Sequence, residues 1–227
     1  MQTIDQLPKA AAWVGTTNFD LRKPNFVVIH HTAQNSCEQT LRTFTLERSK
    51  VSAHYVICKD GTIHHMLNDY MRAWHGGISK WGNNSDLNSS SIGIELDNNG
   101  FEPFDSAQIN SLLLLLAQLK ENYKIPNANF IGHADIAPKR KVDPNIQFPW
   151  ILLAQKGYGL WFEPDAKFSL PESISIPFAL AMVGYDIKDT TAALLAFKRH
   201  FRADSTAVVT ENDRSVLFQL IQNKLSN

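Results

Sequence analysis

Short apolar segments constrain the fold of this chain most strongly, because each has the length of a buried strand and is bounded by polar or turn-forming residues. The first is the run Phe-Val-Val-Ile at residues 26–29, which leads directly into His30 and His31. The other segments predicted to be strands are residues 53–58, 63–67, 91–96 and 129–131. Residues 59–62 carry Asp-Gly at their centre, which predicts a hairpin turn.

Helical patterns alternate with these strands. Residues 38–48 predict a short helix, and residues 105–123 predict a longer one. Asp105 at the start of the longer helix and Gln108 three residues on have the pattern of a capping box. Loose alternation of strands and helices, with one hairpin, predicts an α/β fold with a mixed central β-sheet flanked by helices. Residues 74–90 form a long loop rich in Gly, Asn and Ser, and such loops are usually functional.

The character of the chain changes near its C-terminal quarter, where prolines at positions 164, 171 and 177 indicate a linker. Three amphipathic segments follow, at residues 176–183, 190–201 and 212–225. We therefore predict a larger domain at 1–162 with an N-terminal arm at 1–25, a linker at 163–175, and a small three-helix domain at 176–227.

Composition excludes several functions for this chain of 227 residues. Its formal net charge is zero, so no basic surface for nucleic acid is expected. The longest apolar run, residues 112–116, is too short to cross a membrane, and no signal peptide is visible.

The two cysteines, Cys37 and Cys58, are too few for a disulfide scaffold. An oxidising compartment would permit them to pair, but partly buried free thiols are the expectation.

Residues suited to metal chemistry follow the predicted strands. His30 ends one strand, His133 follows another, and Asp143 comes ten residues later. Two imidazoles and one carboxylate fit a catalytic zinc site with an open fourth position, although this spacing alone is a weak signal. Glu95 lies in an otherwise apolar strand, where burial would raise its pKa and suit it to act as a general base; a strand-edge Glu paired with a surface cation is the alternative.

Six short motifs follow one another along the chain: Val28-Ile-His-His-Thr-Ala33, Ser52-Ala-His-Tyr55, Ala73-Trp-His-Gly-Gly77, Ser91-Ile-Gly-Ile-Glu-Leu96, Gly132-His-Ala-Asp-Ile-Ala-Pro138 and Arg140-Lys-Val-Asp-Pro144. In their order and spacing they resemble the amidase-2 family of N-acetylmuramoyl-L-alanine amidases, which share a fold with peptidoglycan recognition proteins. The likeness spans about residues 25–160 and is greatest to the AmiD branch, envelope amidases with a small C-terminal domain.

The resemblance implies one Zn²⁺ per chain, held by His30, His133 and Asp143. It implies Glu95 as the catalytic acid/base and Lys141 as a cation near the developing oxyanion. Zinc would activate water and polarise the amide carbonyl, while the carboxylate moves the proton to the leaving alanine nitrogen.

One departure from the pattern is His31, where the AmiD branch commonly has Tyr. Neighbouring side chains in a strand point to opposite faces, so only one of His30 and His31 can reach the metal, and the motif favours His30. Predicted substrate contacts are His31, Thr32, Trp74, His75 and Asn88, with Trp81 as a further candidate in the loop. The remaining histidines at 64, 65 and 200 are expected to be surface or packing residues.

The expected partner is peptidoglycan or a muropeptide, including anhydro forms, and the expected state is a monomer in the cell envelope. Three alternatives remain at this stage: a recognition module that binds without cutting, a cytosolic amidase that recycles anhydro-muropeptides, and a secreted lytic enzyme. The C-terminal segment is similar to three-helix peptidoglycan-binding domains, or it is a domain that stabilises the larger one by packing.

Overall fold

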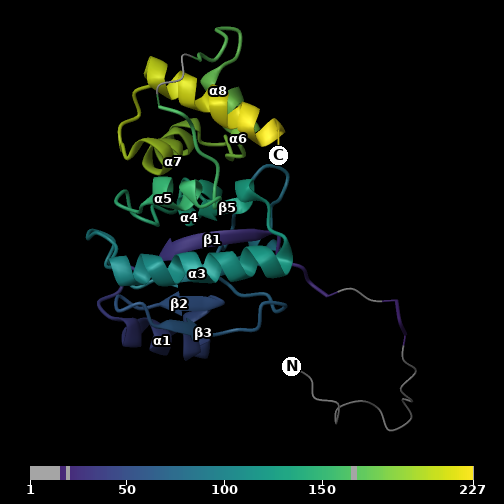
Figure 1. The fold of residues 1–227 in the computed structure, drawn as a ribbon, viewed down its shortest axis with the longest axis vertical. Helices are drawn as coiled ribbons and strands as arrows, with labels where there is room; N and C mark the ends of the chain where they lie inside the picture. Colours follow the sequence, from purple (N-terminus) through teal and green to yellow (C-terminus); the bar gives the residue numbers. More distant parts are fainter. Residues whose placement is uncertain (1–15, 19–20, 165–167, 227) are drawn as a thin grey trace.

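A computed structural model describes residues 16–18, 21–164 and 168–226 (Figure 1). Its centre is a five-stranded sheet in the order β3-β2-β4-β1-β5. The strands are β1 Phe26–His31, β2 Tyr55–Ile57, β3 Ile63–His65, β4 Ser91–Leu96 and β5 Phe130–Gly132. All neighbours are parallel except the β2–β3 hairpin, which is antiparallel and turns where Asp-Gly predicted. The predicted mixed sheet is confirmed.

The helices that accompany the sheet are α1 Cys37–Thr45, α2 Leu87–Ser90, α3 Ser106–Tyr123, α4 His133–Ile136 and α5 Trp150–Gln155. Short 3-10 turns occupy Glu47–Ser49 and Asn127–Asn129. In the part that the structure describes, no helix combines the length and apolarity that a membrane crossing requires.

Side chains point alternately to the two faces of β4, so that one face is apolar and the other is polar. Ile92, Ile94 and Leu96 are fully buried in the core that α3 covers. Ser91, Gly93 and Glu95 point to the other face, because successive strand residues alternate. The register of the parallel pair places His30 of β1 beside Glu95 of β4. One face of β4 therefore packs in the apolar core, and its other face presents the Glu95 carboxylate beside His30.

The expected capping box at the start of α3 is wrong. Asp105 occupies the N-cap without a side-chain bond to the helix among the described residues. Gln108 is fully buried, and its Nε2 donates to the carbonyl oxygens of Ile57, at 2.8 Å, and Asp97, at 3.1 Å. The backbone carbonyl groups at the ends of β2 and β4 are in the interior and need hydrogen-bond donors. Because Gln108 supplies them, its side chain does not bond to the start of its own helix.

The expectation of free thiols is also wrong, because Cys37 and Cys58 form a disulfide. Cys37 begins α1 and Cys58 directly follows β2, and the packing of this helix beside this strand brings their Cα atoms to 5.4 Å. Their separation of 21 residues carries no spacing signal, so only the tertiary arrangement reveals the pair.

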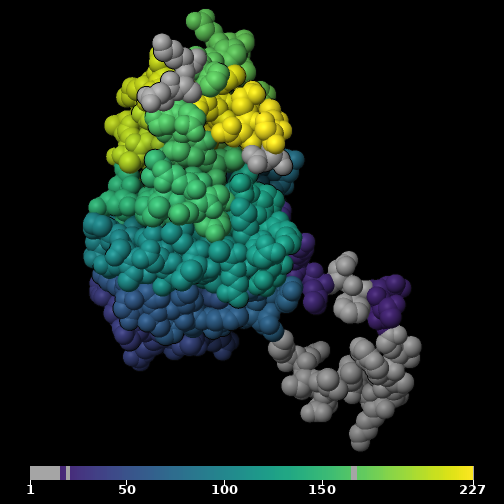
Figure 2. Space-filling model, viewed as in Figure 1, coloured from purple at the N-terminus to yellow at the C-terminus, as the bar shows by residue number. Residues whose placement is uncertain are grey.

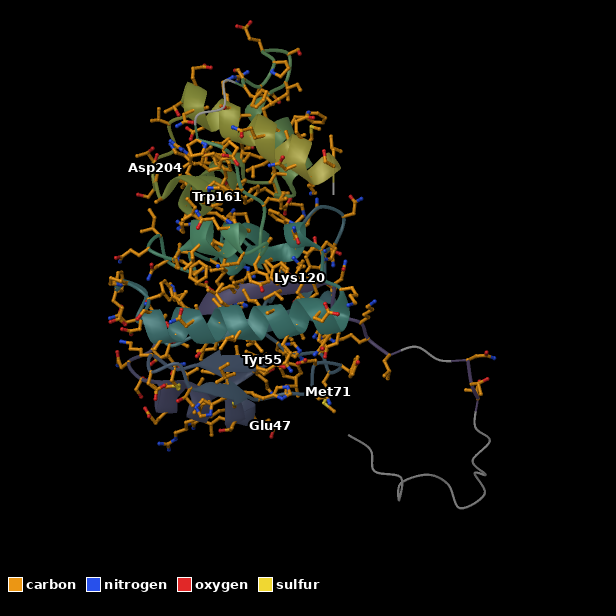
Figure 3. All side chains as sticks on the ribbon, in the orientation of Figure 1. Glu47, Tyr55, Met71, Lys120, Trp161 and Asp204 are labelled. Atoms are coloured by element: carbon orange, nitrogen blue, oxygen red, sulfur yellow. A yellow bond between two sulfur atoms is a disulfide. The ribbon has the colours of Figure 1, made fainter. Side chains whose placement is uncertain are left out.

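The C-terminal region contains α6 Ile176–Val183, α7 Thr190–Arg202 and α8 Glu211–Leu225, close to the predicted segments. Leu180, Phe197 and Leu217 from these helices share one apolar cluster with Val28 of β1 and Ile136 of α4. The two regions form a continuous surface on the face that Figure 2 presents. Figure 3 places Trp161 where they meet, and its ring lies 5.6 Å from that of Phe201. The predicted division at 163–175 thus separates segments that share a core.

Candidate active site

Four polar side chains converge where the carboxyl ends of β4, β1 and β5 meet. His30 and Glu95 are neighbours across β1 and β4, while His133 begins α4 directly after β5. Asp143 comes from the following loop, whose backbone is held to α4 by a bond from the Ala134 amide to the Asp143 carbonyl. The carboxyl edge of parallel strands is the usual place for a site in an open sheet, because the loops there leave a crevice.

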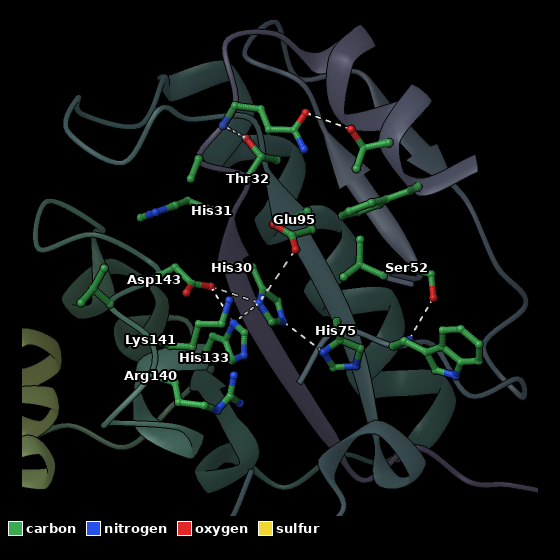
Figure 4. Close-up of a pocket in the computed structure, with 17 residues that line it drawn as sticks. His30, His31, Thr32, Ser52, His75, Glu95, His133, Arg140, Lys141 and Asp143 are labelled. Atoms are coloured by element: carbon green, nitrogen blue, oxygen red, sulfur yellow. Dashed lines mark hydrogen bonds and ion pairs between the residues drawn. The ribbon is translucent and has the colours of Figure 1, made fainter. Parts of the chain in front are cut away.

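Three ligand-type atoms form a compact triangle (Figure 4). His30 Nδ1 lies 2.9 Å from His133 Nδ1 and 3.1 Å from Asp143 Oδ2, and His133 Nδ1 lies 2.9 Å from the same oxygen. A tetrahedral zinc ion with bonds near 2.0 Å needs ligand atoms about 3.3 Å apart, so the triangle fits with a small expansion. All three side chains are buried, and they form a group that could hold a metal ion.

The protonation of this group also suits a cation. Burial, reinforced by the neighbouring His133, lowers the pKa of His30 to about 4, so its imidazole is neutral at pH 7. For Asp143, burial acts to raise the pKa, but hydrogen bonds with His133 and His30 outweigh it and leave the pKa below its usual value. A metal ligand must present a lone pair, and both residues do so.

Glu95 stands beside the triangle with one oxygen unused. Its Oε1 lies 3.9 Å from His30 Nδ1, and its buried Oε2 has no hydrogen-bond partner among the described residues. Burial and the charge of Asp143 raise the pKa of Glu95 to about 8, against the opposing effect of Lys141. A dication at the triangle would oppose this shift. The direction agrees with the raised pKa predicted from the apolar strand.

A cavity of about 390 Å³ opens over these groups. Among its lining residues are His31, Thr32, Trp74, Lys141 and the less expected Arg140. Arg140 belongs to a motif quoted above but received no predicted role; its Nη2 donates to the Gly76 carbonyl at 3.0 Å and thereby holds the loop before the cavity. No pattern in the sequence distinguishes this arginine from a surface cation.

The predicted substrate contacts fall into two sets. Thr32 and the half-exposed Trp74 border the cavity. His31 also borders it, and its Nδ1 accepts from the Asn145 amide at 3.0 Å, away from the metal triangle as strand alternation requires.

The second set has its polar atoms engaged within the protein. The carboxamide oxygen of Asn88 accepts from the amides of His75 and Gly76, so Asn88 shapes the loop. His75 reaches the cavity wall, but it is buried and both ring nitrogens have protein partners. Trp81, expected to line a glycan groove, packs instead against Tyr185 in the core shared with the C-terminal helices.

Comparison with known proteins decides the family. A family model described as N-acetylmuramoyl-L-alanine amidase matches residues 20–146, more than half of the sequence. The chain belongs to the amidase-2 family. Among amidase-2 relatives, the N-acetylmuramoyl-L-alanine amidase AmiD of Escherichia coli K12 is 37% identical over 209 residues, which cover 78% of this chain and 74% of that protein.

Two further similarities extend this finding. The 1,6-anhydro-N-acetylmuramyl-L-alanine amidase AmpD of Haemophilus influenzae is 41% identical over 102 residues, covering 44% of this chain and 55% of that protein. A solved complex of Escherichia coli AmiD with anhydro-N-acetylmuramic acid-L-Ala-D-gamma-Glu-L-Lys superposes with a TM-score of 0.80 at 30% identity. It covers 92% of this chain and 93% of that one. The structural similarity to AmiD therefore extends beyond the residues of the family model into the C-terminal helical region.

Proposed function

We propose that this amidase-2 protein is a zinc-dependent hydrolase of the amide bond between the lactyl group of muramic acid and the L-alanine of the stem peptide. The observation that carries the proposal is the buried His30–His133–Asp143 triangle with Glu95 beside it, whose Oε2 has no hydrogen-bond partner in the part of the chain that the structure describes; all four residues line an open cavity. Similarity to AmiD and AmpD, which are named as amidases of muramyl and anhydromuramyl substrates, supports the substrate class.

The residues divide the reaction among themselves. Zinc, when bound, supplies a Lewis acid that polarises the amide carbonyl and acidifies water. Glu95 takes a proton from the attacking water on its free Oε2 and delivers it to the leaving alanine nitrogen. Lys141 borders the same cavity and adds positive charge near the developing oxyanion. Thr32, His31 and Trp74 lie where they can orient the muropeptide.

A complete ligand set favours an enzyme over a recognition module that binds without cutting. The test is mass spectrometry of the products that the purified protein releases from peptidoglycan, with and without a chelator. We expect free stem peptides that disappear with chelation and return with added Zn²⁺. Binding to peptidoglycan without any release of peptide would contradict the proposal and support the recognition module.

For the compartment, we propose the cell envelope, because structural disulfides persist in oxidising surroundings and Cys37–Cys58 is paired. A cytosolic recycling enzyme is the alternative. Measuring turnover on intact and anhydro muropeptides side by side separates them: the envelope enzyme accepts both, whereas the recycling enzyme requires the anhydro sugar. Thiol labelling of the protein in intact cells adds a second test, and free thiols there would contradict the envelope assignment.

A further inference from the structure

His75 is placed to act on the metal site without touching substrate. Its ring is buried, and it lies perpendicular to that of His30 with the centroids 5.1 Å apart. His75 Nδ1 lies 3.0 Å from His30 Nε2, the ring nitrogen on the far side from the metal triangle. His75 Nε2 lies 3.2 Å from Ser91 Oγ. Both of its nitrogens are therefore committed to protein partners.

The direction of each hydrogen bond between His30, His75 and Ser91 can be worked out from the last acceptor, the Leu87 carbonyl. Leu87 offers a carbonyl oxygen, which can only accept, so the Ser91 hydroxyl donates to it. Because that proton is used, Ser91 Oγ must accept from His75 Nε2–H. A neutral imidazole carries one N–H, and His75 uses it on Nε2 toward Ser91, so its Nδ1 is an acceptor. His30 Nε2–H is then the donor.

This order leaves only one tautomer for His30. With the proton on Nε2, the lone pair of Nδ1 points toward His133 and Asp143, which is where a metal would need it. The opposite tautomer would place two lone pairs face to face between His30 and His75. A hydrogen bond from the outer nitrogen of a ligating histidine both fixes its tautomer and orients its ring.

The surrounding backbone is shaped to hold His75 in place. Its amide donates to Asn88 Oδ1 at 3.1 Å. On the other side, a Cβ at Gly93 would lie 2.4 Å from His75 Cγ, so a side chain at that position of β4 would expel the ring. The absence of a side chain at position 93, between Ser91 and Glu95 on the polar face, has a packing reason.

We propose that His75 is a positioning residue that fixes the Nδ1-ligating tautomer of His30, through a relay that runs from His30 by way of His75 and Ser91 to the Leu87 carbonyl. The inference rests on the proposed zinc site, and it assigns His75 to the metal rather than to the substrate. Loss of such a partner weakens metal affinity by about 10–100-fold in comparable sites.

The test measures the Zn²⁺ dissociation constant by competition with a chromogenic chelator. We expect His75→Phe to weaken binding by about 10–100-fold. His75→Asn should restore most of the loss, because its carboxamide oxygen can accept from His30 Nε2–H. Tyr55→Phe is the matched control: it also removes a buried hydrogen bond, from the Tyr55 hydroxyl to Asp69 Oδ2 at 3.0 Å, but on the face of the sheet that packs in the apolar core. The control should lower the melting temperature and leave zinc affinity unchanged.

Three results separate the possible failures. Wild-type affinity in His75→Phe, with normal zinc binding by the unmodified protein, would overturn the relay alone. Absence of zinc binding by the unmodified protein would overturn the proposed function. Independently of any variant, long-range ¹H–¹⁵N spectra of the zinc-loaded protein should find the His75 proton on Nε2; a proton on His75 Nδ1 would overturn the relay even if His75→Phe failed to fold.

Discussion

Two buried His–Asp clusters contain residues of the same short helix, and they differ in the space beside them: about 390 Å³ beside one and about 10 Å³ beside the other. The metal triangle uses His133, whereas Asp135 of the same short helix α4 belongs to a sealed cluster. Asp135 Oδ2 accepts from His200 Nδ1 at 2.7 Å and from the Gly132 amide, and Asp135 Oδ1 accepts from the Tyr185 hydroxyl at 2.9 Å. Both clusters contain buried acids and imidazoles.

The two clusters differ in how many of their polar atoms have a hydrogen-bond donor or acceptor as a partner. Each carboxylate oxygen of Asp135 has a donor, and stacking of His200 on Trp150 closes the cluster. In the metal triangle, lone pairs face one another and Glu95 Oε2 has no partner among the residues described. Residue type therefore does not distinguish a structural cluster from a reactive one; unsatisfied hydrogen-bonding capacity that faces an opening does.

The largest expected effect tests the reactive side. Glu95→Gln keeps the shape of the side chain but removes the base, so turnover of muropeptide should fall by about 10²–10⁴-fold while zinc content stays at one per chain. Peptide release and metal analysis on the same preparation measure both. Glu102→Gln, which alters an exposed ion pair with Lys59, is the control and should retain activity. Full activity in Glu95→Gln would remove Glu95 from the mechanism.

A smaller effect comes from the raised pKa of Glu95 in the metal-free protein. Its folded-state pKa of about 8 lies above the reference value of 4.5, so the folded state binds the extra proton, and stability is lost as pH rises toward the folded value. Between pH 6.5 and 8 the loss should be about 2 kcal/mol. Buried histidines with lowered pKa values, such as His30 and His54, act in the opposite direction, because they are neutral in the folded state while their protonated fraction in the unfolded state falls across that window.

The measurement is urea unfolding of the chelated protein at both pH values, for the unmodified chain and for Glu95→Gln. Relative to Glu95→Gln, the unmodified chain should lose about 2 kcal/mol between the two pH values, since the amide does not ionise and the contribution of the histidines is common to both chains. Added Zn²⁺ should reduce the loss, because a cation favours the charged carboxylate. Equal slopes for the two chains would show that Glu95 titrates normally.

The smallest effect tests the sealed side. Tyr185→Phe leaves Asp135 Oδ1 without its donor, which should lower the free energy of unfolding by about 1–3 kcal/mol. Zinc affinity and turnover of the folded protein should be unchanged, since His133 and Asp143 are held by contacts that do not involve Tyr185. Thermal unfolding and peptide release measure the two properties. A loss of zinc affinity larger than the loss of stability would mean that the two clusters are coupled.

Much of this arrangement could be predicted from the sequence. His30 and Glu95 end or interrupt apolar strands, and parallel strands bring such positions to one edge. The amphipathic pattern predicted a segment at residues 176–183, and α6 spans Ile176–Val183. The pairing of Cys37 with Cys58 could not be predicted in this way, because it depends on packing between α1 and β2.

His75 illustrates the same limit within the site. A histidine between Trp74 and two glycines is equally compatible with substrate contact and with support of a ligand. The choice depends on the ring of His30, 45 positions away in the sequence, and on the missing side chain at Gly93. Periodicity describes neighbours along the chain, whereas these contacts join separate elements of the fold.

The position of Asp135 on α4 has a consequence for chimeric enzymes. A shortened amidase that ended near residue 162 would keep His30, His133 and Asp143 but would leave the Asp135 carboxylate without Tyr185 and His200, and without the helices that cover it. A transplant of the sheet-bearing half onto another carrier therefore needs a compensating change at position 135, such as a small apolar residue, or a new donor from the carrier. Whether the sheet-bearing half can be moved to another carrier therefore depends on position 135, two residues after His133.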